Sequence, residues 1–180
     1  MDKKIQDILS FFSLTGHQLL LSGMNSSHSG NLSVIDGEHI YITRSGTMLG
    51  HINDGDIIKA DCTDSNPPKA SMEYPVHRQI YIDTAFNAVI HCHPPYATAL
   101  SLSNDEIEPL DMEGKRIVQL VPVVRGEDNI PDLVSAQCQK GHRGVMVKGH
   151  GVFVAADSME EALHVVTAME MSAKIISLSR

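Results

Sequence analysis

Two histidines separated by one residue end a short apolar segment, a spacing typical of a metal site. The segment spans residues 88–93 and ends in His91-Cys92-His93. Side chains alternate across a strand, so we predict that His91 and His93 point the same way while Cys92 points to the opposite face. Histidine is the commonest metal ligand in proteins. The pattern predicts two ligands for one ion, although two ordinary histidines would give the same letters.

A catalytic zinc ion takes three protein ligands and keeps one position open, so a third ligand is needed. His150 is a candidate because it stands between Gly149 and Gly151, where the backbone can come close to a ligand. On the residues alone, a turn histidine is the more ordinary interpretation. Glu73 would place a carboxylate near the metal; its alternative is an acid that complements the positive end of a helix.

A second group of residues consists of glycine, serine and asparagine in expected turns. Such turns expose backbone N–H groups and hydroxyls, and together they can cradle a phosphate. Each turn alone is unspecific, because most turns of this composition bind nothing. The candidates are Ser29-Gly30-Asn31, Ser45-Gly46 and Ser71.

The elements that must position these residues alternate between helices and strands. Hydrophobic spacing predicts a helix over residues 3–22, and further helices over 73–83, from Pro94-Pro95 and from Ser158. Asp36-Gly37 indicates a hairpin between two strands. The expected strands are residues 31–34, 39–43, 56–60, 88–93, 116–124, 144–148 and 151–155. This order predicts a layered α/β domain whose sheet is mixed or partly antiparallel.

Composition limits the class of protein. The chain has 180 residues, a net charge of −8 and 42% hydrophobic residues, so we expect one globular domain over residues 1–180. The acidic balance argues against nucleic-acid binding. We expect no signal peptide, because the first residues carry acids without an apolar run, and no membrane helix, because that needs roughly 20 apolar residues. Three scattered cysteines favour a reducing cytoplasm over a disulfide framework.

In this order, the motifs resemble the class II aldolase/adducin-head family. The matching segments are residues 29–33, 42–46, 71–73 with His77, 88–93, 149–152 and 160–178. The resemblance implies a three-layer αβα sandwich around a central mixed, mainly antiparallel sheet. It also implies a homotetramer with active sites at subunit contacts, and a phosphorylated sugar as substrate.

The resemblance assigns roles residue by residue. It implies a zinc ion, or another divalent ion, held by His91, His93 and His150. It makes Glu73 the catalytic acid/base. The spacing of His77, one helical turn after Glu73, separately predicts a position near the site. The implied phosphate-binding residues are Gly30, Asn31, Ser45, Gly46 and Ser71.

The implied activity is that of a zinc-dependent aldolase, a lyase of carbohydrate metabolism. It would reversibly cleave a ketose 1-phosphate, such as L-fuculose 1-phosphate or a related pentulose or 5-deoxypentulose phosphate, to dihydroxyacetone phosphate and an aldehyde. Alternatives within the family are a methylthioribulose-1-phosphate dehydratase, a sugar-acid phosphate decarboxylase and a 4-epimerase. The epimerases usually carry Asp at the position of Glu73. A non-catalytic adducin-like module is disfavoured, because all three histidines and Glu73 are present.

The chain departs from the family pattern at a few positions. Met72 replaces a frequent second serine, and Arg44 replaces a frequent proline. One hypothesis is that Arg44 supplies charge to the phosphate; the alternative is a surface arginine. Some relatives use a C-terminal tyrosine as proton donor, but no tyrosine follows Tyr96 here. Tyr96 is a substitute candidate, and a packed helix residue is its more ordinary interpretation.

Overall fold

The computed structural model describes residues 3–126 and 129–179; the remaining positions of the predicted 1–180 domain lie outside the described residues. The helices are α1 (Lys3–Leu21), α2 (Tyr74–Asp83), α3 (Pro95–Ser101), α4 (Met112–Ile117), α5 (Ile130–Gln139) and α6 (Met159–Leu178), with a 3₁₀ turn η1 (Asp54–Asp56). The strands are β1 (Asn31–Asp36), β2 (His39–Thr43), β3 (Ile57–Asp61), β4 (Ala88–Cys92), β5 (Glu106–Ile107), β6 (Val121–Val124), β7 (Gly144–Val147) and β8 (Gly151–Ala156).

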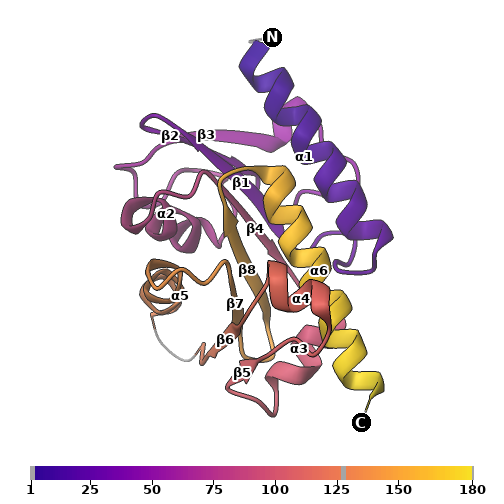
Figure 1. The fold of residues 1–180 in the computed structure, drawn as a ribbon. Coiled ribbons are helices and arrows are strands. Elements are labelled where there is room, and N and C mark those ends of the chain that lie inside the picture. The colour runs from indigo at the N-terminus through magenta and orange to yellow at the C-terminus, as the bar shows by residue number, and fades with distance from the viewer. Residues whose placement is uncertain (1–2, 127–128, 180) are drawn as a thin grey trace.

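The strands form one sheet in the order β3-β2-β1-β4-β8-β7-β6-β5. Neighbouring strands are antiparallel except β6 and β7, which are parallel. Figure 1 shows α1 and α6 on one face of the sheet, with α3 and α4 beside α6, and α2 and α5 on the other face. The predicted three-layer αβα sandwich with a mixed, mainly antiparallel sheet is therefore confirmed.

The central strand β4 is buried on both faces because helices cover the sheet from both sides. All five of its residues are buried. Ile90 and Cys92 pack into the core beneath α1 and α6, while Val89 packs into the core beneath α2 and α5. His91 lies on the Val89 face, where its ring stacks on Phe153. The predicted alternation of His91 and Cys92 across the strand is confirmed.

The region between α3 and β7 differs from the sequence prediction. A strand over residues 116–124 is wrong at its start, because residues 112–117 form α4 and only Val121–Val124 form β6. Asp111 caps α4 by accepting a hydrogen bond from the Gly114 N–H. Gly114 packs so tightly that an added Cβ would lie 2.1 Å from Ser172 Oγ of α6. Packing on α6 therefore accounts for a helix where the sequence predicted the start of a strand. Helix α5 was also not predicted.

The β1–β2 hairpin is confirmed, with Asp36 paired to His39 and Gly37 at a φ of 57°. Helix α6 begins as predicted at the Ser158 cap, whose hydroxyl accepts from the Glu161 N–H. Within the described residues, no helix is both long and apolar enough to cross a bilayer.

Candidate metal centre and active site

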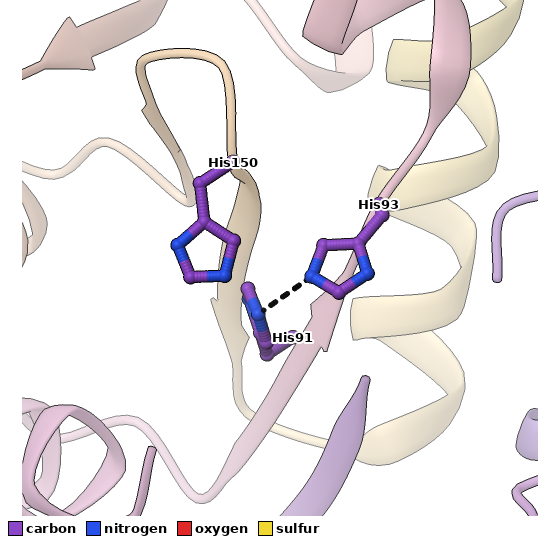
Figure 2. A group of neighbouring side chains, drawn as sticks. All are labelled: His91, His93 and His150. Atoms are coloured by element: carbon purple, nitrogen blue, oxygen red, sulfur yellow. Dashed lines mark hydrogen bonds between the residues drawn. The ribbon is translucent and has the colours of Figure 1, made fainter. Parts of the chain in front are cut away.

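Three histidine rings converge where β4 ends beside the β7–β8 turn. Figure 2 shows His91 between His93, which follows β4, and His150, which lies in the turn. One ligand nitrogen from each residue lies within 4.8 Å of the others, and the Nε2 atoms of His91 and His93 are 3.1 Å apart. Zinc–nitrogen bonds of about 2.0–2.1 Å in a tetrahedral site place neighbouring nitrogens about 3.4 Å apart. The cluster has the donor type and spacing that suit one divalent ion.

The surroundings of His91 prepare its Nε2 atom to bind a metal. Its Nδ1 atom lies 2.9 Å from the Val152 carbonyl oxygen, which can only accept, so Nδ1 carries the proton and Nε2 presents its lone pair. The ring stacks on Phe153 with a centroid distance of 4.2 Å. Burial, followed by the neighbouring His93 and His150, holds the pKa of His91 well below its usual range. Burial also lowers the pKa of His93. Both rings are therefore neutral near pH 7, as metal binding requires.

The turn carrying His150 depends on a close backbone approach. The N–H of His150 donates to the Val147 carbonyl oxygen at 3.0 Å, and Gly149 has a φ of 68°. An added Cβ on Gly151 would lie 2.4 Å from both the Cys92 carbonyl oxygen and His93 Cδ2. Glycine at position 151 thus lets β8 pass directly beside the end of β4.

Replacing Gly151 with Ala is expected to weaken metal binding by about 10–100-fold, the usual cost of disturbing groups that orient metal ligands. The new methyl group would have to displace the His93 ring or the backbone at Cys92. Competition of a colorimetric chelator for the bound ion measures the affinity. Gly55→Ala is the matched control, because an added Cβ there meets no atom within 4 Å. Equal affinities for the two variants would contradict the expectation.

The carboxylate of Glu73 reaches the same cluster from the start of α2. The Glu73 N–H donates to Ser71 Oγ, which holds the chain in its turn into the helix. Glu73 Oε1 lies 3.9 Å from His150 Nε2. Partial burial raises the pKa of Glu73, and the nearby His150 opposes this effect. The carboxyl group is therefore placed to exchange protons with a ligand beside the three histidines.

One pocket of about 200 Å³ contains every site residue that the sequence predicted. The predicted residues lining it are Gly30, Asn31, Ser45, Gly46, Ser71, Glu73, His91, His93 and His150. The lining also includes Ser29, Arg44 and Met72, which the sequence analysis had considered beside these residues, and it adds His28. His28 had no predicted role, and its position next to Ser29-Gly30 was the only signal in the sequence.

The Gly30-Asn31 turn packs closely against the backbone of the histidine cluster. An added Cβ on Gly30 would lie 2.5 Å from Asn25 Nδ2 and 2.7 Å from the His91 carbonyl oxygen. Asn25 was missed by sequence reasoning; its Oδ1 accepts from the His93 N–H at 3.2 Å. Asn31 lies opposite His91 across the β1–β4 pair, and its buried Oδ1 has no hydrogen-bond partner among the described residues. The side-chain oxygen of Asn31 is therefore available to accept a hydrogen bond at the pocket.

The backbone amides of the two predicted serines are already engaged. The Ser45 N–H donates to Lys69 O at 3.0 Å, and the Ser71 N–H donates to Thr43 O at 3.2 Å. The groups that these serines can offer a ligand are consequently their hydroxyls.

Arg44 and Tyr96, which the sequence analysis left with two interpretations each, both contact groups outside the proposed chemistry. The Nε and Nη2 atoms of Arg44 both donate to Asp56 Oδ1, at 3.2 and 2.6 Å. One hypothesis assigned the charge of Arg44 to the substrate phosphate, but this charge is paired with the Asp56 carboxylate. Arg44 nevertheless lines the pocket. Tyr96 lies outside the pocket lining and packs against the core, with Lys174 Nζ 5.6 Å from its ring centre. The more ordinary interpretation of Tyr96 fits the structure.

His77 lies beneath the site in a buried polar chain. Its Nδ1 atom is 2.6 Å from Ser33 Oγ, which is also 2.6 Å from the Tyr81 hydroxyl. The His77 ring meets the edge of Phe153, on which His91 stacks. The Phe153 ring therefore contacts both His77 and His91, one of the three clustered histidines. Complete burial lowers the pKa of His77 to about 3.

The buried His77 should make folding sensitive to acid. Its folded pKa of about 3 lies below the ordinary 6.5, so the unfolded chain takes up the proton first as the pH falls. The stability contributed by the neutral ring is complete above pH 6.5 and is lost progressively toward pH 3. From pH 7 to pH 5, His77 should lower the free energy of unfolding by about 2 kcal/mol.

Urea unfolding at pH 7 and pH 5, with a chelator present throughout, measures this contribution. We expect a His77→Gln variant to lose about 2 kcal/mol less than the wild type between the two values. The same pH dependence in both proteins would show that His77 does not carry it.

Comparison with known proteins identifies the family. The family described as Class II Aldolase and Adducin N-terminal domain matches residues 13–177. The chain belongs to this family. A class II aldolase family relative, the L-fuculose phosphate aldolase of Methanocaldococcus jannaschii, is 32% identical over 154 residues, covering 83% of this chain and 84% of that protein.

Other members of the class II aldolase family support the match. The methylthioribulose-1-phosphate dehydratase of Marinobacter nauticus is 28% identical, covering 86% of this chain and 85% of that protein. The crystal structure of L-fuculose-1-phosphate aldolase from Thermus thermophilus superposes with a TM-score of 0.92 at 30% identity, covering 96% of this chain and 93% of that chain. The present chain is an enzyme of the lyase class, in a family whose class II aldolases depend on a metal ion.

Proposed function

We propose that this enzyme is a zinc-dependent aldolase that reversibly cleaves a ketose 1-phosphate to dihydroxyacetone phosphate and an aldehyde. L-Fuculose 1-phosphate, or a related pentulose or 5-deoxypentulose phosphate, is the proposed substrate. The observation that carries the proposal is the single pocket in which three histidines, the Glu73 carboxyl group and three Gly/Ser/Asn turns meet. Similarity to L-fuculose phosphate aldolases supports the substrate class.

In the proposed mechanism, His91, His93 and His150 would hold a divalent ion, which would supply Lewis-acid stabilisation of the negative charge that develops on the substrate. Three imidazole nitrogens suit zinc, which in catalytic sites takes three protein ligands. Glu73 removes a proton from the hydroxymethyl carbon of dihydroxyacetone phosphate in the condensation direction, and returns it after cleavage. Its raised pKa favours this exchange.

The turns around Gly30-Asn31, Ser45-Gly46 and Ser71 are proposed to hold the substrate phosphate. Hydroxyl and amide donors must supply this binding, because the protein carries a net charge of −8 and Arg44 is paired with Asp56. Local hydrogen bonds and the metal would thus have to hold the phosphate against repulsion by the net negative charge of the protein.

A methylthioribulose-1-phosphate dehydratase is the second candidate. Its specific support is the similarity to dehydratases of this name, including the 28% identical protein of Marinobacter nauticus. The same histidines and a carboxylate that moves a proton beside a carbonyl would serve that reaction as well.

A panel of ketose 1-phosphates separates the two reactions. It would offer fuculose, rhamnulose, ribulose, 5-deoxyribulose and methylthioribulose 1-phosphates to the zinc-loaded protein, with products identified by mass spectrometry. Release of dihydroxyacetone phosphate supports the aldolase. Loss of water from an intact carbon chain identifies a dehydratase, and no turnover of any member contradicts both.

We further propose a cytoplasmic homotetramer with the active sites at subunit contacts. Apolar side chains exposed near the pocket and along α1 support an assembly, because large exposed apolar patches commonly mark interfaces. These side chains are Met72, Phe11, Leu14 and Leu21. Light scattering of the purified protein measures the subunit number.

A further inference from the structure

A second pocket lies at the opposite end of β7 from the histidine cluster. It has a volume of about 350 Å³ and opens between the end of α4, the residues before β7 and the first turns of α6. Figure 1 shows α4 lying against α6 above the sheet in this region. The side chains important for its chemistry are Arg116, Gln119, His142, Arg143, Glu161 and His164.

This pocket is separate from the active site. His142 and Arg143 precede β7, whereas His150 follows it. The strand has four residues, and strands rise about 3.3 Å per residue, so its length alone separates the two sites by roughly 13 Å. The two pockets share no lining residue.

The charge of the pocket is opposite to that of the protein. The two guanidinium groups of Arg116 and Arg143 outnumber the single acid of its lining, whereas the chain as a whole carries −8. Glu161 is the one acid in the lining, and its carboxylate is already engaged. Its Oε1 atom accepts from Arg143 Nη1, and its Oε2 atom accepts from the Asp157 N–H. The carboxylate therefore leaves Arg116 without a counter-charge.

Arg116 stands apart from the other arginines in the described part of the chain. It has no hydrogen bond or ion pair there, whereas each of the others has an acceptor. Those pairs are Arg44 with Asp56, Arg78 with the Cys62 carbonyl, Arg125 with Asp105, and Arg143 with Glu161. The imidazoles of His142 and His164 are also without partners among the described residues. Three side chains that can donate hydrogen bonds thus face a pocket of small-molecule size with their donors unused.

We propose that this pocket binds a small phosphate-bearing anion, either inorganic phosphate or a phosphate monoester. The planar guanidinium fork of Arg116 matches two phosphate oxygens at once, and charge-assisted hydrogen bonds of this kind are among the strongest in proteins. The imidazoles supply further donors, and Arg143 adds positive charge while its pair with Glu161 holds it in place. The volume admits a single phosphate group with a short carbon chain. The proposal does not depend on which sugar phosphate the active site cleaves.

Isothermal titration of the intact metal-loaded protein with inorganic phosphate tests the proposal. The comparison uses the wild type, Arg116→Ala, and the matched control Arg125→Ala, which removes the same charge from an exposed pair outside the pocket. A Ser71→Ala variant identifies phosphate bound at the proposed active site. Arg116 is exposed at the end of α4, so its truncation leaves the core intact.

We expect Arg116→Ala to weaken one phosphate-binding event by at least about tenfold, with Arg125→Ala and Ser71→Ala retaining it. That event should also weaken as salt is raised from about 50 to about 200 mM, because the attraction is electrostatic. Repeating the titration with glycerol phosphate assigns the source: tighter binding indicates a phosphate monoester, and equal or weaker binding indicates inorganic phosphate. Unchanged phosphate binding in Arg116→Ala, or loss of all binding in Ser71→Ala, would overturn the proposal.

Discussion

A Glu73→Gln variant is expected to lose about 10²–10⁴-fold in kcat for sugar-phosphate cleavage while keeping its metal ion. The amide has nearly the same shape as the carboxylate but cannot take up and return a proton. Glu73 lies beside the histidine cluster, with its Oε1 3.9 Å from His150 Nε2, so its loss should affect the chemical step more than metal binding. The KM for substrate should change far less than kcat.

Steady-state kinetics and metal analysis of the same samples measure both effects. Glu160→Gln is a matched control, because Glu160 is an exposed acid in the first turn of α6 and lies outside the pocket. Retained turnover in Glu73→Gln with the ion still bound would remove Glu73 from the mechanism. Loss of the ion together with activity would instead make it a metal ligand.

Truncating one histidine of the cluster should abolish activity through loss of the ion. We expect His93→Ala to bind metal at least about 100-fold more weakly, because two ligands replace three and even disturbing the groups around ligands costs up to about 100-fold. Activity should fall with occupancy and return in part at high metal concentration. His93 follows the end of β4 and is only partly buried, so the variant should still fold.

Elemental analysis after dialysis against a chelator measures the ion in each variant. His17→Ala removes an exposed imidazole from α1 and should keep the wild-type content. One ion per chain retained by His93→Ala would place the metal elsewhere. Unfolding followed by circular dichroism shows whether either substitution has disturbed the fold.

Local periodicity in the sequence predicted the parts of the site that are close along the chain. Alternation across a strand was enough to place His91 and Cys92 on opposite faces, and Asp36-Gly37 was enough to predict the hairpin. His150 and Glu73 were different. Their residue types alone made them candidates but favoured a turn histidine and a helix-start acid, and the resemblance to a family was needed to favour a role at the metal pair.

Long-range packing accounts for what the sequence could not predict. The strand order, with β4 next to β8, joins segments far apart in the chain. The segment at residues 112–117 became a helix because it packs on α6, with Gly114 against Ser172. The pairing of Arg44 with Asp56, and the chain from Tyr81 through Ser33 to His77, likewise depend on contacts between separate elements.

The placement of His91 on a doubly covered central strand has a thermodynamic consequence. Its ring is fixed by Phe153 and by the Val152 carbonyl oxygen before any ion arrives. The conformational entropy of ordering this ligand is therefore lost during folding of the core, and little of it remains to be lost on metal binding. Small zinc domains fold only with their ion. With this ligand preorganised, we expect the metal-free chain to stay folded and to lose and regain an ion without passing through the unfolded state.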